Sequence, residues 1–454
     1  MRIICPGPRT GAFFVHAKAD AGSPSQVSHP LAGNVHDALM RMPPPPVSAV
    51  DACRADAFDQ LFVSHFIDSF GLRRNTATGP TWLERLPALL SVSGGSVLSR
   101  ASIRSASMLS YGTWAHDEAV RTESFRWYAS ALAQLSLSIA EGKLSNAGTV
   151  EMRVCAAVML IHFETWAGTS HNAWLHHVKG AASLLEAAGP EACRKGFMQS
   201  VFSHMRFQIF IATMHENKLH AFAEDRWLDI PFRDQGKTFF DELVDALFLV
   251  QQCLFVTQKQ IELLQAKNKE AAATVKNFVI NASRLLSEWH VKYAPFLQSS
   301  FFIEISRQID AASLQSTALS HSNNPQLLAS RVPEASLISL FHAARLIIAQ
   351  ISSATTAGVP DTAEDDTRVI LCATDFVSQY NSSGPGSKLR PFMMLPGLKI
   401  VSLWSPLDEA RTAALAQLLD HKFLNSPMAD IALTPEGYFS MAAKGILNIH
   451  REFL

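Results

Sequence analysis

Hydrophobic residues recur along most of this chain at intervals of three and four, the spacing that places side chains on one face of an α-helix. The pattern is clearest between positions 174 and 188. One stripe there consists of Trp174, Val178, Ala181, Leu185 and Ala188. Gly189 favours the backbone conformation that ends a helix and Pro190 cannot continue one, so a helix is predicted to end at this point.

The same period predicts helices on both sides of this stretch. Apolar faces fall at about residues 58–70, 101–111, 120–140, 152–166, 198–212, 240–264, 278–289, 337–351, 369–380, 409–423 and 434–450. Pro295 is predicted to end one helix, and Thr434, followed by Pro435, to begin the last. Alternation with a period of two is rare, so the predicted fold class is all-α, with many helices.

The first fifty residues differ in composition from the rest of the chain. They are rich in Pro, Ser and Gly and include the run Pro43 to Pro46. Such a segment buries little apolar surface to offset the entropy of ordering. We therefore expect a flexible arm over residues 1–50 and one all-helical domain over residues 51–454, with further loops at residues 311–334 and 382–387.

The composition favours a chain with a large core and no attraction to polyanions. Of 454 residues, 48% are hydrophobic and 17% charged, and the formal net charge is −1. This balance directs the chain neither to nucleic acid nor to an anionic membrane. The most apolar segment, Leu337 to Ile351, is interrupted by His342 and Arg345, so we expect no membrane span and an intracellular protein.

The patterns that resemble catalytic or metal-binding motifs have the wrong spacing. His215 and His220 are five residues apart, which turns the second imidazole off the first one's helix face. The acidic residues between Asp361 and Asp366 are interpreted as a solvated helix cap. We therefore predict no catalytic residues, no metal site and no cofactor.

The six cysteines are scattered singly through the chain. Zinc sites normally use cysteine pairs two to four residues apart, and no such pair occurs. Cys155 falls on an apolar helix face, where it is interpreted as a small buried hydrophobic residue.

Ten residues, in this order and spacing, resemble the regulatory domain of the fungal zinc-binuclear-cluster transcription factors. These signature residues are Trp174, His177, Gly180, Ala181, Leu184, Leu185, Gly189, Arg206, Trp227 and Pro231. The similarity is sharpest from Met152 to Phe232, where Phe232 replaces a frequent Trp. The family's DNA-binding module, with six clustered cysteines, has no counterpart in these residues.

The resemblance implies a regulator or co-regulator of transcription in the nucleus, for example of a secondary-metabolite pathway. Without its own DNA-binding module, it would reach DNA only indirectly, through a protein partner such as a DNA-binding factor or a second copy, and a small-molecule effector is a further expectation. A cysteine-rich segment missing upstream is an open alternative.

Two of the signature residues, His177 and Arg206, carry polar groups that are suited either to contact a ligand or to stabilise the fold. His177 is interpreted as a buried hydrogen-bonding histidine, and Arg206 as a structural ion-pair or carbonyl-capping residue in preference to a ligand contact. A second function class also stays open: a helical enzyme or ligand-binding protein with no role in transcription.

Overall fold

The computed structural model describes residues 49–70, 82–91, 96–141, 147–170, 172–297, 332–355, 361–380, 394–419 and 431–451. Every regular element in these ranges is a helix, so the all-α prediction is confirmed for the described part of the chain. Residues 1–48 of the predicted arm lie outside these ranges, and its last two residues begin the helix Ala49–Phe70. The predicted loop at residues 382–387 and residues 311–331 of the predicted loop at 311–334 also lie outside them, whereas residues 332–334 belong to the helix Val332–Thr355.

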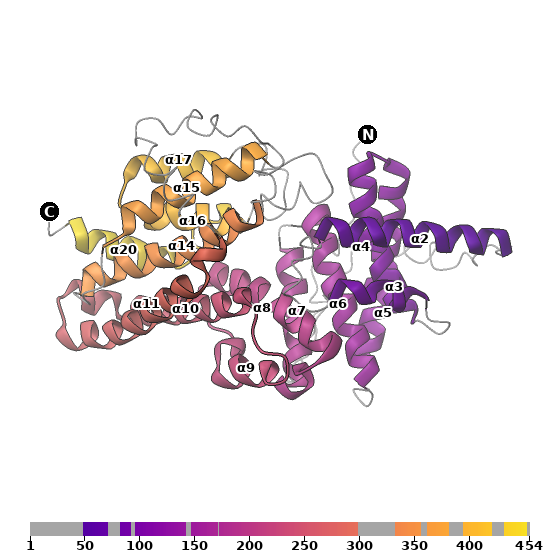
Figure 1. Ribbon diagram of the computed structural model, residues 1–454, viewed down its shortest axis with the longest axis horizontal. Coiled ribbons are helices and arrows are strands. Elements are labelled where there is room, and N and C mark those ends of the chain that lie inside the picture. Colours follow the sequence, from indigo (N-terminus) through magenta and orange to yellow (C-terminus); the bar gives the residue numbers. More distant parts are fainter. Residues whose placement is uncertain are drawn as a thin grey trace, which may run out of the picture.

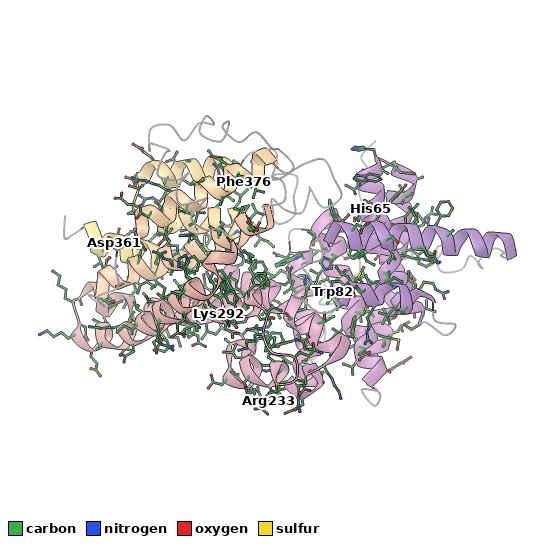
Figure 2. The ribbon with its side chains drawn as sticks, in the orientation of Figure 1. His65, Trp82, Arg233, Lys292, Asp361 and Phe376 are labelled. Carbon is green, nitrogen blue, oxygen red and sulfur yellow. The ribbon has the colours of Figure 1, made fainter. Side chains whose placement is uncertain are left out.

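The described helices form two groups with one helix between them (Figure 1). The N-terminal half contains α2 (Ala49–Phe70), η1 (Trp82–Arg85), α3 (Leu86–Ser91), α4 (Val97–Ala115), α5 (Glu118–Ala140), α6 (Ala147–Ala167) and α7 (Ala173–Ala188). The C-terminal half contains α10 (Phe239–Gln265), α11 (Lys269–Leu297), α14 (Val332–Thr355), α15 (Ala363–Tyr380), α16 (Leu395–Trp404), α17 (Asp408–Leu418) and α20 (Ser440–Arg451). Trp82 and Lys292 mark the two halves in Figure 2.

Small side chains allow the helices of the N-terminal half to approach closely. Helix α4 packs against α2, α5 and α6, and its buried face includes Ala101, Ala106 and several serines. Several of these serine hydroxyls donate to carbonyls of their own helix, as Ser102 Oγ does to Ser99 O at 3.0 Å and Ser105 Oγ does to Ser102 O at 2.8 Å, which satisfies them despite their burial.

Helix α8 (Gly196–Glu216) is shared by the two halves. It packs against α6 and α7 on one side and against α10 on the other. Near its end, Lys179 of α7 forms an ion pair with Glu216, while Gln251 of α10 donates to Thr213 Oγ1 at 2.7 Å. The short elements η2 (Pro190–Cys193), η3 (Ala221–Ala223), α9 (Asp225–Asp229) and η4 (Ile230–Phe232) adjoin it.

Helix α14 lies at the centre of the C-terminal half, in contact with α10, α11, α15, α16 and α20. Within the described ranges, only its segment Glu334–Thr355 is long and apolar enough to cross a membrane, and 89% of the most apolar stretch is buried inside the protein. A core helix passes the same length and composition test, and that is the position α14 occupies.

The start of the last helix differs from the prediction. Helix α20 begins at Ser440 and not after Thr434, because Tyr438 and Phe439 both adopt positive φ angles, 59° and 55°. Tyr438 N donates to Met214 O at 2.8 Å, and Phe439 N donates to Asn217 Oδ1. The C-terminus of α8 therefore fixes a turn that local sequence preferences would not select.

Three further predictions need correction or sharpening. Pro295 does not end its helix, since α11 continues to Leu297. The apolar face predicted at about residues 240–264 is found on α10, which ends at Gln265, and Lys267 between α10 and α11 has a φ of 58°. Asp366 is not a solvated cap residue, because it is fully buried against His342, whereas Asp361 does cap its helix by accepting from Ala363 N at 3.1 Å.

Candidate functional site

The signature residues of α7 face the protein interior. Trp174, His177, Gly180, Ala181 and Leu185 are buried, and Leu184 is half-buried against the core. The absence of bulk at Gly180 and Ala181 falls where α7 lies between α6 and α8. Small buried side chains at these positions leave room for a neighbouring helix to come close.

His177 belongs to a buried hydrogen-bond network that joins three helices. The hydroxyl of Tyr128 on α5 donates to Glu164 Oε1 on α6 at 2.5 Å, and His177 Nε2 lies 3.0 Å from that hydroxyl. Because the hydroxyl's one hydrogen goes to the carboxylate, His177 Nε2 is the donor in the second contact. Thr169 donates to Glu164 from its hydroxyl at 2.7 Å and its backbone N–H at 2.9 Å.

Burial dominates the acid–base properties of this network. It raises the pKa of Glu164, although the hydrogen bonds from Tyr128 and Thr169 oppose the rise. Burial also lowers the pKa of His177 to about 3, and the charge of His176 next to it acts in the same direction. The Tyr128 hydroxyl, between the neutral imidazole of His177 and the buried carboxyl group of Glu164, joins α5, α6 and α7.

Gly189 ends α7 as the sequence predicts. Its φ and ψ of 81° and 161° lie in a region that is almost restricted to glycine. Its N–H donates to the carbonyls of Leu185 and Glu186, and Pro190 follows as the first residue of η2. The chain thus leaves α7 abruptly and turns towards α8.

Arg206 lies at the junction of α8 and α10 and is fully buried. Its Nη2 pairs with Asp245, and its Nη1 lies 3.2 Å from the carbonyl oxygen of Asp241 and 3.5 Å from Asp241 Oδ1. Lys237 Nζ contacts the other oxygen of Asp245 at 2.5 Å. Two cations therefore face two carboxylates, so the buried cluster carries no net charge.

Asp241 also closes the first turn of α10. It forms a capping box with Thr238, in which Thr238 N donates to Asp241 Oδ2 at 3.0 Å and Asp241 N donates to Thr238 Oγ1 at 3.2 Å. Ser203 of α8 donates to Asp241 Oδ1 at 2.5 Å. Asp241 therefore takes part both in the capping box of α10 and in the ion pair with Arg206 of α8.

Aromatic rings surround the Arg206 guanidinium and connect it with the remaining signature residues. Its central carbon lies 5.0 Å from the ring centre of Phe232 and 6.0 Å from that of Phe202. Trp227 is buried 5.3 Å from Phe202, and Pro231 is buried in the turn that presents Phe232. Since any aromatic face attracts a cation, Phe232 can take the place of the Trp that is frequent in the domain that this sequence resembles.

The hydrogen bonds and ion pairs of these two networks stabilise the packing of the helices. Burial raises the pKa of Cys155, Cys193, Cys253 and Cys372 to about 12, which keeps these thiols protonated and unreactive at neutral pH. No group of three potential ligands that could hold a metal ion occurs in the part of the chain that the structure describes. Each charge at Arg206 is matched by a carboxylate.

Sequence reasoning singled out His177 and Arg206 but not their partners. Tyr128 and Glu164 are 49 and 13 residues away from His177, and nothing in the local sequence indicates the contact. Asp241 did leave a signal, because Thr238 three residues before it forms a recognisable capping-box pattern at the start of an apolar run.

The fold and these networks define an all-α protein whose two helical halves meet at one shared helix. No family model, curated protein or solved structure matches this chain. The functional assignment therefore depends on its own residues and their arrangement.

Proposed function

We propose that this chain is a nuclear regulator or co-regulator of transcription, similar to the regulatory domains of fungal zinc-binuclear-cluster factors, that reaches DNA through a protein partner. The resemblance suggests genes of a secondary-metabolite pathway as its targets. The partner is a DNA-binding factor, or a second copy that recruits one.

The observation that carries the proposal is the clustering of the signature residues in space. Residues of α7 and α8 and the turn at Trp227 and Pro231 pack into one buried unit, with Arg206 at the junction to the C-terminal half. A buried, charge-balanced junction suits a protein whose task is to hold or change the relation between two helical bodies.

The first experiment tests location and effect in the cell. The tagged chain is expected to accumulate in the nucleus, and its rapid depletion is expected to change the transcripts of a defined gene set. Re-expression of Arg284→Gln, which alters an exposed ion pair with Glu288, should restore those transcripts. Trp227→Ala, which removes a buried aromatic side chain, should not.

The second experiment tests the dependence on a partner. Chromatin immunoprecipitation should recover the chain at its target promoters, and the signal should disappear when the co-purifying DNA-binding factor is deleted. Unchanged transcripts after depletion, together with turnover of a small molecule by the purified protein, would replace this proposal with that of a helical enzyme.

A further inference from the structure

A second group of polar side chains lies in the C-terminal half, around the ring of Phe341 on α14. The imidazole of His290 on α11 stacks on this ring with centroids 5.0 Å apart and planes 9° apart. The guanidinium of Arg345 lies 5.6 Å from the ring centre, and the His342 imidazole lies 5.1 Å from it, edge-on. Helices α11 and α14 thus bring three nitrogen-bearing groups to one aromatic ring.

The carboxylate of Asp366 determines which ring nitrogen of His342 carries a hydrogen. Its Oδ1 lies 2.6 Å from His342 Nδ1 and 3.5 Å from Arg345 Nε, and its Oδ2 accepts from the Thr362 hydroxyl at 2.6 Å. Because an ionised carboxylate only accepts, Nδ1 of His342 carries the hydrogen. With the hydrogen on Nδ1, Nε2 of a neutral imidazole is a hydrogen-bond acceptor, and it points away from Asp366.

Three polar groups of this cluster have no hydrogen-bond partner in the part of the chain that the structure describes. His342 Nε2 and His290 Nε2 are buried without one. Arg345 makes no hydrogen bond through its Nη groups, and its side chain is 30% exposed, so solvent and solutes reach it. Buried polar atoms without partners are costly and rare in folded proteins, which indicates that something else supplies the missing contacts.

The charges of the cluster determine which kind of ligand fits. A metal ion is disfavoured, because the described residues offer only two imidazoles here and Arg345 repels a cation. The planar guanidinium of an arginine is suited to a carboxylate or a phosphate. The acceptor His342 Nε2, however, needs a donor, which a plain carboxylate or a sulfate lacks.

We propose that Arg345, His342 and His290 form a binding site for an oxyanion that also donates a hydrogen bond. Hydrogenphosphate groups and 2-hydroxy acids share this chemistry: their charged oxygens face Arg345 and their hydroxyl donates to His342 Nε2. This binding proposal does not depend on the proposed role of the chain in transcription. If the proposed function holds, it is the place where a metabolite signal enters the C-terminal half.

The test uses the purified full chain at about pH 7 and four anions in matched pairs. Inorganic phosphate is compared with sulfate, and lactate with acetate, because only the first of each pair carries a hydroxyl. Calorimetry measures affinity, and imidazole nitrogen NMR signals report on His290 and His342. Phosphate or lactate should bind saturably, at least about tenfold more tightly than its partner anion, with a shift of the His342 Nε2 signal. Which of the two binds distinguishes a phosphate ligand from a hydroxy acid.

Variants connect the binding to the site. Arg345→Gln should weaken binding by at least about tenfold. Arg345→Lys should weaken it by less, because lysine keeps the positive charge but lacks the planar guanidinium with its paired N–H donors. Arg284→Gln on the exposed face of α11 should bind as the unaltered chain does. The proposal is overturned if none of the four anions binds saturably, if phosphate and sulfate bind equally and lactate and acetate do too, or if Arg345→Gln and Arg345→Lys, both folded by circular dichroism, bind unchanged.

Discussion

Replacement of Arg206 by Met tests the interpretation of the α8–α10 junction. The change keeps a long apolar stem among the phenylalanine rings but removes the cation that faces Asp241 and Asp245. Breaking a buried ion pair on one side costs roughly 3–5 kcal/mol, because the remaining charge is left without compensation. Lys237 still neutralises part of Asp245, so we expect about 3 kcal/mol, at the lower end.

The assay is urea unfolding followed by both circular dichroism and tryptophan fluorescence, because two halves of this size need not unfold together. Arg206→Met should lower the free energy of unfolding by about 3 kcal/mol. Adding Asp245→Asn should restore part of the loss, because one cation, Lys237, and one carboxylate, Asp241, then leave the cluster without net charge. Arg284→Gln, at an exposed ion pair, should change it by less than about 1 kcal/mol. A cost for Arg206→Met within about 0.5 kcal/mol of zero would refute the view that this junction depends on the buried charge.

Three further changes in stability follow from the structure. Gly397→Ala would bring its Cβ into steric conflict with Ser339 Oγ in the core, so urea unfolding should show a loss of about 1–3 kcal/mol that Ser339→Ala in the same chain largely relieves. Gly189→Ala should cost about 1–3 kcal/mol by the same measurement, since no steric contact but a φ of 81° opposes the side chain; a neutral effect would contradict the backbone assignment. Burial lowers the pKa of His177 to about 3 and of His204 to about 4, so the unfolded chain binds more protons below about pH 6.5, and each histidine should remove about 2–3 kcal/mol of stability between about pH 6.5 and 4.5. His204→Gln should flatten that pH dependence, and an unchanged slope would show that His204 is not buried in its neutral form.

The helices were predictable because their signals are local. Period, end residues and composition located α5, α7 and α8 to within a few residues. The abrupt end of α7 at Gly189 follows from backbone sterics alone, since few other residues adopt its conformation.

Elements whose conformation depends on distant contacts were predicted less well. The turn before α20 was expected to be helical from Thr434, yet Tyr438 and Phe439 adopt left-handed conformations because α8 supplies hydrogen bonds through Met214 and Asn217. Those partners lie more than 200 residues earlier in the chain. No window of neighbouring residues contains that information.

The candidate sites show the same division. The sequence by itself predicted the helices of the described ranges, because the side-chain period is a local property. It also predicted a buried, hydrogen-bonding His177 and a structural Arg206, because a polar group is buried only with partners. Only the tertiary structure decided that Arg206 meets Asp241 and Asp245, and that Asp366 orients His342. A buried charge must find a partner, but which one it finds depends on how whole helices pack against each other.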